Sequence, residues 1–94
     1  MNHICQLAQL ILDFYREEPK QLRQLAALRH CKVFRRWGVL YIRCYTQETA
    51  AALVDAGLAI AEPVARLRLC KKIIILNNNT SVAMFPVDLS KINV

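Results

Sequence analysis

The spacing of apolar residues changes at Cys31, and this change constrains the fold more than any other feature of the chain. Before Cys31, apolar side chains recur every three or four residues, as on one face of an α-helix. After it, residues 39–45 alternate with a period of two and are rich in β-branched and aromatic side chains, as in a strand. The two patterns predict an α+β fold in which helices cover one face of a small, mainly antiparallel sheet.

Two helical segments are predicted before the sheet. Residues 3–18 gather their apolar side chains on one helical face, formed by Ile4, Leu7, Leu10, Ile11 and Phe14. Pro19 interrupts this helix and suits the first turn of a second one over residues 20–29. The two segments form either a helical hairpin or one kinked helix.

A β-hairpin is predicted over residues 31–45. Trp37-Gly38 supplies the turn, because glycine accepts positive φ. A two-residue turn places Cys31 opposite Cys44, Lys32 opposite Arg43, Val33 opposite Ile42 and Phe34 opposite Tyr41. Alternation then turns one face toward the helices, with Val33, Leu40, Ile42 and the two cysteines on it.

The remainder of the chain predicts a helix followed by one or two strands. Thr46 is a suitable N-cap, and Gly57 and Pro63 are expected to end or break the helix around residues 57–62, with a short second piece over 64–69. The run 73–76 has no polar alternation, which predicts a strand covered on both faces. Asparagines 77–79 suit a turn before a last strand over 81–87. We expect one domain over residues 1–88 and a loose tail over 89–94.

From Gly38 onward, an alternating strand, a capped alanine-rich helix and the apolar strand 73–76 follow one another after the leading helices. This order resembles the core of the KH-like domain at the N-terminus of the replication initiator DnaA, and it also resembles the helicase-loader family DciA. The resemblance implies a KH-like topology. KH domains clamp nucleic acid with a GXXG loop, and this chain has only Gly38 and Gly57, so the resemblance supplies no set of binding residues.

Composition limits the classes of partner and compartment. The net charge of +6 favours an anionic partner, such as nucleic acid or an acidic protein, although basic charge can also serve solubility alone. Hydrophobic residues make up 55% of the chain, more than one small core is expected to hide, which favours a homo-oligomer. Polar residues interrupt the first apolar segment, so we expect no signal peptide and a cytoplasmic location with reduced thiols. The longest apolar run, residues 50–61, contains Asp55 and is too short to span a bilayer, so we also expect no membrane span.

No constellation of residues predicts catalysis, a metal or a cofactor. The four cysteines lack CxxC spacing, and neither histidine lies at zinc-ligand spacing from one. Acidic residues are few and scattered, and no glycine-rich phosphate loop is present. We therefore expect a non-enzymatic protein with structural thiols and neither metal nor cofactor.

The second face of the hairpin is the candidate binding site. It carries Lys32, Phe34, Arg36, Tyr41, Arg43 and Tyr45. Cations interleaved with aromatic rings are typical of proteins that bind single-stranded nucleic acid, and an anion there would relieve the repulsion between Lys32 and Arg43. The same pattern also fits an ordinary solvated face with a cross-strand aromatic pair, or a face covered by a second subunit.

Downstream of the hairpin, a second basic group is open to two interpretations. It consists of Arg66, Arg68, Lys71 and Lys72. These cations either extend an anion-binding surface or lie at a solvated helix end, where positive charge complements the helix dipole.

The sequence thus favours a small interaction module that binds nucleic acid, or a nucleic-acid-processing protein, through the outer face of its sheet. The alternative is a protein–protein adaptor or homodimer. In that case a second chain buries the aromatic side chains Phe34, Trp37, Tyr41 and Tyr45.

Overall fold

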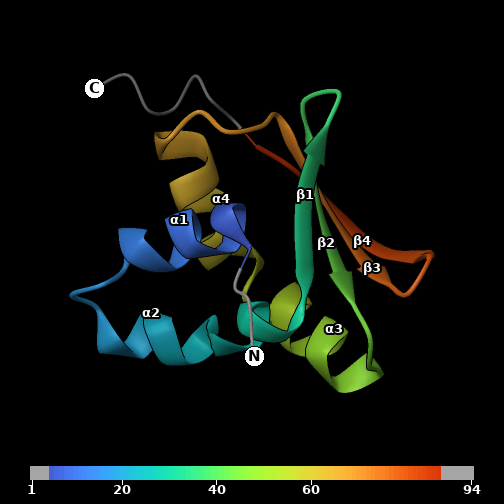
Figure 1. The fold of residues 1–94 in the computed structure, drawn as a ribbon, viewed down its shortest axis with the longest axis horizontal. Coiled ribbons are helices and arrows are strands. Elements are labelled where there is room, and N and C mark those ends of the chain that lie inside the picture. The colour runs from blue at the N-terminus through green and yellow to red at the C-terminus, as the bar shows by residue number, and fades with distance from the viewer. Residues whose placement is uncertain (1–4, 88–94) are drawn as a thin grey trace.

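A four-stranded sheet and a layer of helices on one of its faces make up residues 5–87, the part of the chain that this computed structural model describes (Figure 1). Helix α1 (Gln6–Phe14), helix α4 (Gly57–Arg66) and the helical segment before the sheet all lie on the same side of the strands. The opposite side carries no helix among the described residues. The α+β fold with helices on one face is confirmed.

The leading helical segments form a hairpin. Helix α1 spans Gln6–Phe14, helix α2 spans Pro19–Gln24, and a short 3₁₀ helix follows over Ala26–His30. The first helix ends four residues before the predicted end at Glu18. Glu18 takes extended backbone angles (φ −123°, ψ 82°), as expected of a residue that precedes proline.

The strands follow one another across the sheet in chain order. They are β1 (Lys32–Arg36), β2 (Val39–Cys44), β3 (Lys72–Asn77) and β4 (Thr80–Pro86). The outer two pairs are antiparallel, and β2 and β3 are parallel. Parallel neighbours need a long crossover connection, which α3 (Gln47–Asp55) and α4 (Gly57–Arg66) supply. The sheet is therefore mixed, with antiparallel pairs in the majority.

The predicted hairpin register is confirmed. Lys32 pairs with Arg43 and Phe34 with Tyr41, and Arg36 and Val39 close the ladder at the turn. Trp37 (φ 55°) and Gly38 (φ 75°) both adopt positive φ, the signature of a type I′ turn. Glycine tolerates this conformation freely, whereas a bulky side chain such as Trp37 is strained there.

Helix α3 begins as predicted, but the break that follows it is not where the sequence indicated. The backbone N–H of Thr49 donates to Thr46 Oγ1 at 3.1 Å, so Thr46 is the N-cap. The chain then breaks at Ala56, and α4 starts at Gly57 and continues through Pro63. The predicted break around residues 57–62 is instead a single residue, Ala56. Residues 64–66 are helical as predicted, but they belong to α4 and do not form a separate piece.

A hydrogen bond from the first helical segment explains how α4 tolerates Pro63. Proline has no N–H, so the carbonyl of Ala59, four residues earlier, loses its intrahelical donor. The buried Tyr15 hydroxyl donates to that carbonyl oxygen at 2.8 Å. The bond joins residues 44 apart in the chain, and it satisfies the group that the proline leaves without a donor.

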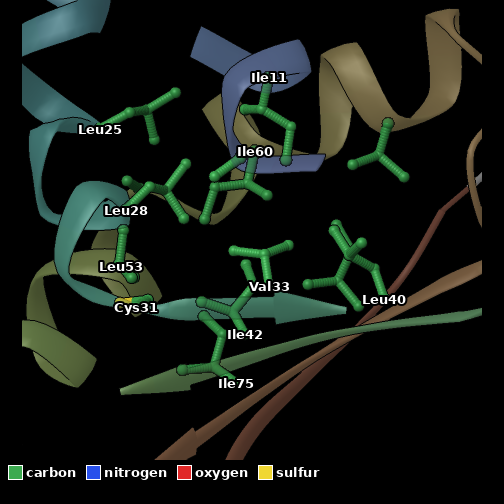
Figure 2. Close-up of a cluster of buried hydrophobic side chains, with 14 of the residues drawn as sticks. Ile11, Leu25, Leu28, Cys31, Val33, Leu40, Ile42, Leu53, Ile60 and Ile75 are labelled. Carbon is green, nitrogen blue, oxygen red and sulfur yellow. The ribbon is translucent and has the colours of Figure 1, made fainter. Parts of the chain in front are cut away.

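The core fills the space between the helices and the inner face of the sheet (Figure 2). Side chains of Ile11, Leu28, Leu53 and Ile60 meet those of the strands, among them Val33, Leu40, Ile42 and Ile75. Cys31 and Cys44 lie in the same cluster with their sulfur atoms 3.6 Å apart, which agrees with their predicted positions opposite each other.

Strand β3 departs from the prediction in its burial. Ile73 and Ile75 are fully buried, but Ile74 and Leu76 are only half-buried on the other face. Within residues 5–87, the predicted cover is present on one face of the strand only, because the helices described there all lie on one side (Figure 1). The open face therefore keeps apolar side chains in contact with solvent.

Two further expectations concern the ends of the chain and membranes. The predicted loose tail, residues 89–94, lies outside the described residues. Between residues 5 and 87, no helix combines the length and the apolar character that crossing a bilayer requires.

Candidate functional site

Three rows of side chains cross the open face of the sheet, with one residue from each strand in every row. The central row is Phe34, Tyr41, Ile74 and Met84. The flanking rows are Lys32, Arg43, Leu76 and Ser81 on one side, and Arg36, Val39, Lys72 and Pro86 on the other. We call these three rows the outer face. They contain four cations and no aspartate or glutamate.

Two aromatic rings stack near the middle of the outer face. The ring centroids of Phe34 and Tyr41 are 5.1 Å apart, and the ring planes are inclined by only 11°. Both side chains are half-buried, so they present ring surface to solvent as well as to each other. The predicted cross-strand aromatic pair is therefore present between β1 and β2, and we call it the aromatic platform.

Two cationic side chains lie over the Phe34 ring. Lys32 Nζ lies 5.9 Å from the ring centroid and Arg43 Cζ lies 5.4 Å from it, both within cation–π range. The pairing of Lys32 with Arg43 places these like charges opposite each other, as predicted. Arg43 Nε is buried and has no hydrogen-bond partner within the described part of the chain, so this donor is unsatisfied.

An open depression of about 490 Å³ collects most of the predicted site residues. Its lining is Lys32, Phe34, Arg35, Arg36, Tyr41, Arg43 and Leu76. Five of the six predicted residues are present. The sixth, Tyr45, follows the end of β2, is 52% exposed and does not line this depression. Arg35 and Leu76 were not predicted.

The two unpredicted lining residues differ in what the sequence could have revealed. Arg35 belongs to the inner side of edge strand β1 and donates from Nη1 to the carbonyl of Leu69 at 3.2 Å. Alternation alone assigns it to the helical side. Leu76 joins the site because β3 pairs with β2, and no sequence pattern specified that pairing.

The second basic group divides between two environments. Arg66 lies in the last turn of α4, in agreement with the helix-end interpretation. Lys72 belongs to β3 and pairs with Val39, which places it in the same row as Arg36 on the outer face. Lys71 precedes it, and its backbone N–H donates to the carbonyl of Gly38 at 2.8 Å. The lysines therefore extend the basic surface of the hairpin.

The hairpin turn brings an exposed aromatic side chain to the end of this surface. Trp37 is 93% exposed, although tryptophan is among the largest apolar side chains. The sequence marked it only as a turn residue and as a side chain that a second subunit would bury.

The thiols are part of the core. Burial raises the pKa of the Cys31, Cys44 and Cys70 thiols, which disfavours the nucleophilic thiolate at neutral pH. Over residues 5–87, no three His, Cys, Asp or Glu side chains are grouped so as to hold a metal ion.

Comparison with protein-family models, with curated proteins and with solved structures finds no match to this chain. The resemblance to the DnaA N-terminal domain and to DciA stays a prediction.

Proposed function

We propose that this protein is a non-enzymatic module that binds single-stranded nucleic acid on its outer face. The observation that carries the proposal is the Phe34–Tyr41 stack, which lies between two cationic rows on a surface without carboxylates. Single-strand binders combine cations that track phosphates with rings on which bases stack. The net charge of +6 adds a long-range attraction for a polyanion.

The four outer-face cations determine the expected salt dependence. If Lys32, Arg36, Arg43 and Lys72 each neutralise one phosphate, the slope of log K against log salt concentration is about −3. Fluorescence anisotropy of a labelled single-stranded oligonucleotide at several salt concentrations measures this slope.

Two variants separate the electrostatic and stacking contributions. Replacing Arg43 by alanine is expected to weaken binding and to make the slope shallower by about 0.7, because one phosphate contact is lost. Replacing Tyr41 by alanine is expected to weaken binding by about 1–3 kcal/mol, because a stacked base is lost, and to leave the salt slope unchanged.

The matched control removes an arginine from the helical layer. Arg23 lies in the last turn of α2, and its replacement by alanine changes the net charge as Arg43→Ala does. We expect binding to stay close to that of the wild type. Absence of binding at low salt, or equal losses for the two arginine variants, contradicts the proposal.

A second candidate function is self-association through the β3–β4 half of the outer face. Ile74 and Leu76 are half-buried there, and Met84 is 59% exposed. Apolar side chains clustered on an open sheet face favour coverage by a second copy. Three of the four outer-face cations lie on β1 and β2 and would repel their own copies, so a dimer would use β3 and β4.

Sedimentation equilibrium tests this second candidate. The wild-type protein is expected to be a dimer at high concentration, and Met84→Lys is expected to shift it to monomer, since a charge would be buried in the interface. The control is Leu58→Lys, because Leu58 is 88% exposed on the helical layer and is expected to leave the dimer intact. A wild-type monomer at every concentration rules out this candidate.

A further inference from the structure

The turn between β1 and β2 holds a side chain that the fold itself does not use. Trp37 is 93% exposed and adopts φ 55°, where a bulky L-residue is strained. Asparagine, aspartate and glycine are the residues that favour this turn position. The indole therefore contributes little packing and makes the turn harder to form, which is understandable if it contacts something outside the chain.

The turn is held in a defined position. The carbonyl of Gly38 accepts a hydrogen bond from the backbone N–H of Lys71 at 2.8 Å, and the carbonyl of Lys71 accepts one from Val87 N–H at 2.8 Å. These bonds tie the hairpin tip to the segments next to β3 and β4. A ring carried on such a tip is pre-positioned, so less conformational freedom is lost when a ligand binds to it.

Three cations surround the tip. Arg36 precedes Trp37 in the chain, and Lys72 shares a row of the outer face with Arg36. Lys71 lies beside Gly38, with its Cε 3.8 Å from the position that a Cβ on that glycine would occupy. Trp37 is three residues beyond Phe34, or about 10 Å along the direction of the strand. The tip therefore continues the cationic and aromatic surface of the outer face.

We propose that Trp37, with Arg36, Lys71 and Lys72, forms an end subsite that stacks one unpaired base of a single-stranded nucleic acid. This inference rests on the proposed function, because the same strand would run from the tip onto the Phe34–Tyr41 platform. A lone indole among cations matches a base with its flanking phosphates. Binding to a lipid surface is less consistent with this tip, because such binding requires a larger apolar area than one indole ring provides.

Trp37 is the one tryptophan of the chain, so its intrinsic fluorescence reports on the tip alone. Titration with an unlabelled oligothymidylate is expected to quench this emission. The quenching should follow the same binding curve as the anisotropy of a labelled oligothymidylate, which reports on the whole surface. Trp37→Asn is expected to lower the affinity by about 5- to 150-fold, the range that corresponds to one lost stacking contact.

Stability measurements separate a binding role from a structural one. Trp37→Asn is expected to keep or raise the melting temperature, because asparagine suits positive φ. Trp37→Phe keeps a ring and is expected to retain most of the affinity. The matched control is Leu58→Ala, which removes an equally exposed apolar side chain from the helical layer and should leave binding unchanged.

The possible outcomes distinguish the two proposals. If the labelled oligonucleotide binds while Trp37 emission does not change and Trp37→Asn binds as the wild type does, the end subsite is wrong and the outer-face proposal stands. If no oligonucleotide binds, both fail. If Trp37 emission shifts to the blue only with vesicles of anionic phospholipid, the tip is a membrane contact and the end subsite is likewise overturned.

Discussion

Replacing Ile75 by alanine is expected to lower the free energy of unfolding by about 2–5 kcal/mol, whereas the same replacement at Ile74 is expected to lower it by about 1 kcal/mol. The two residues are neighbours in β3, but Ile75 is fully buried against the helices and Ile74 is half-buried on the outer face. Stabilities of small domains are about 5–15 kcal/mol, so the first change is severe. Urea unfolding of both variants measures the difference.

The Ile74 variant also responds to a second copy of the chain. If the outer face is covered in a dimer, the destabilisation by Ile74→Ala grows with protein concentration, because the folded state is then linked to association. The effect of Ile75→Ala should grow much less, since that side chain lies in the core of each subunit. Equal losses in the two variants at low concentration would contradict the assignment of the inner face as the core.

Removing one hydroxyl from the core is the second change with a large expected effect. Tyr15→Phe is expected to lower the free energy of unfolding by about 1–3 kcal/mol, because the Ala59 carbonyl then has neither its intrahelical donor nor the phenol. Thermal or urea unfolding measures the loss.

A double-mutant cycle with Pro63 isolates this explanation. Pro63→Ala restores the backbone N–H that bonds the Ala59 carbonyl in a regular helix. In that background, Tyr15→Phe is expected to cost much less than in the wild type, and effects of Pro63→Ala on the unfolded chain cancel in the cycle. Equal losses in the two backgrounds would mean that Tyr15 acts only through packing.

The same hydroxyl adds a pH dependence. Burial, and secondarily the carboxylate of Glu62, raises the pKa of Tyr15 to about 12 from its ordinary value of 10.0. The folded state thus holds this proton more tightly than the unfolded chain. The corresponding stabilisation is complete below pH 10 and is lost as the pH rises toward 12. The difference in stability between the wild type and Tyr15→Phe should therefore shrink over this interval.

The hairpin could be predicted in detail because its information is local. A two-residue turn at Trp37-Gly38 determines which residues of β1 and β2 are opposite each other, and alternation then sorts the two faces. The course of α4 could not be predicted in the same way. Local sequence rules predict that Pro63 ends or kinks a helix. The hydroxyl that compensates for the missing N–H belongs to Tyr15, which is far away in the sequence.

The candidate site was predictable only within the hairpin. The Phe34–Tyr41 pair and the opposed Lys32 and Arg43 follow from the register. The contributions of Leu76 and Lys72 depend on the parallel pairing of β2 with β3, for which the chain carries no short-range signal. The partial exposure of Ile74 and Leu76 on the outer face was not predicted either, because four consecutive apolar residues in β3 indicate burial without stating which chain provides the cover.

The parallel pairing of β2 with β3 has a consequence for the order of folding. The pairs β1–β2 and β3–β4 each close through a two-residue turn, so their contacts are local and need little loop entropy. The seam between β2 and β3 closes only after α3 and α4 have crossed over, and contacts of such sequence separation form slowly. The central row of the outer face spans this seam. A partial opening at the seam would therefore separate Ile74 and Met84 from the aromatic platform while each hairpin kept its own pairing.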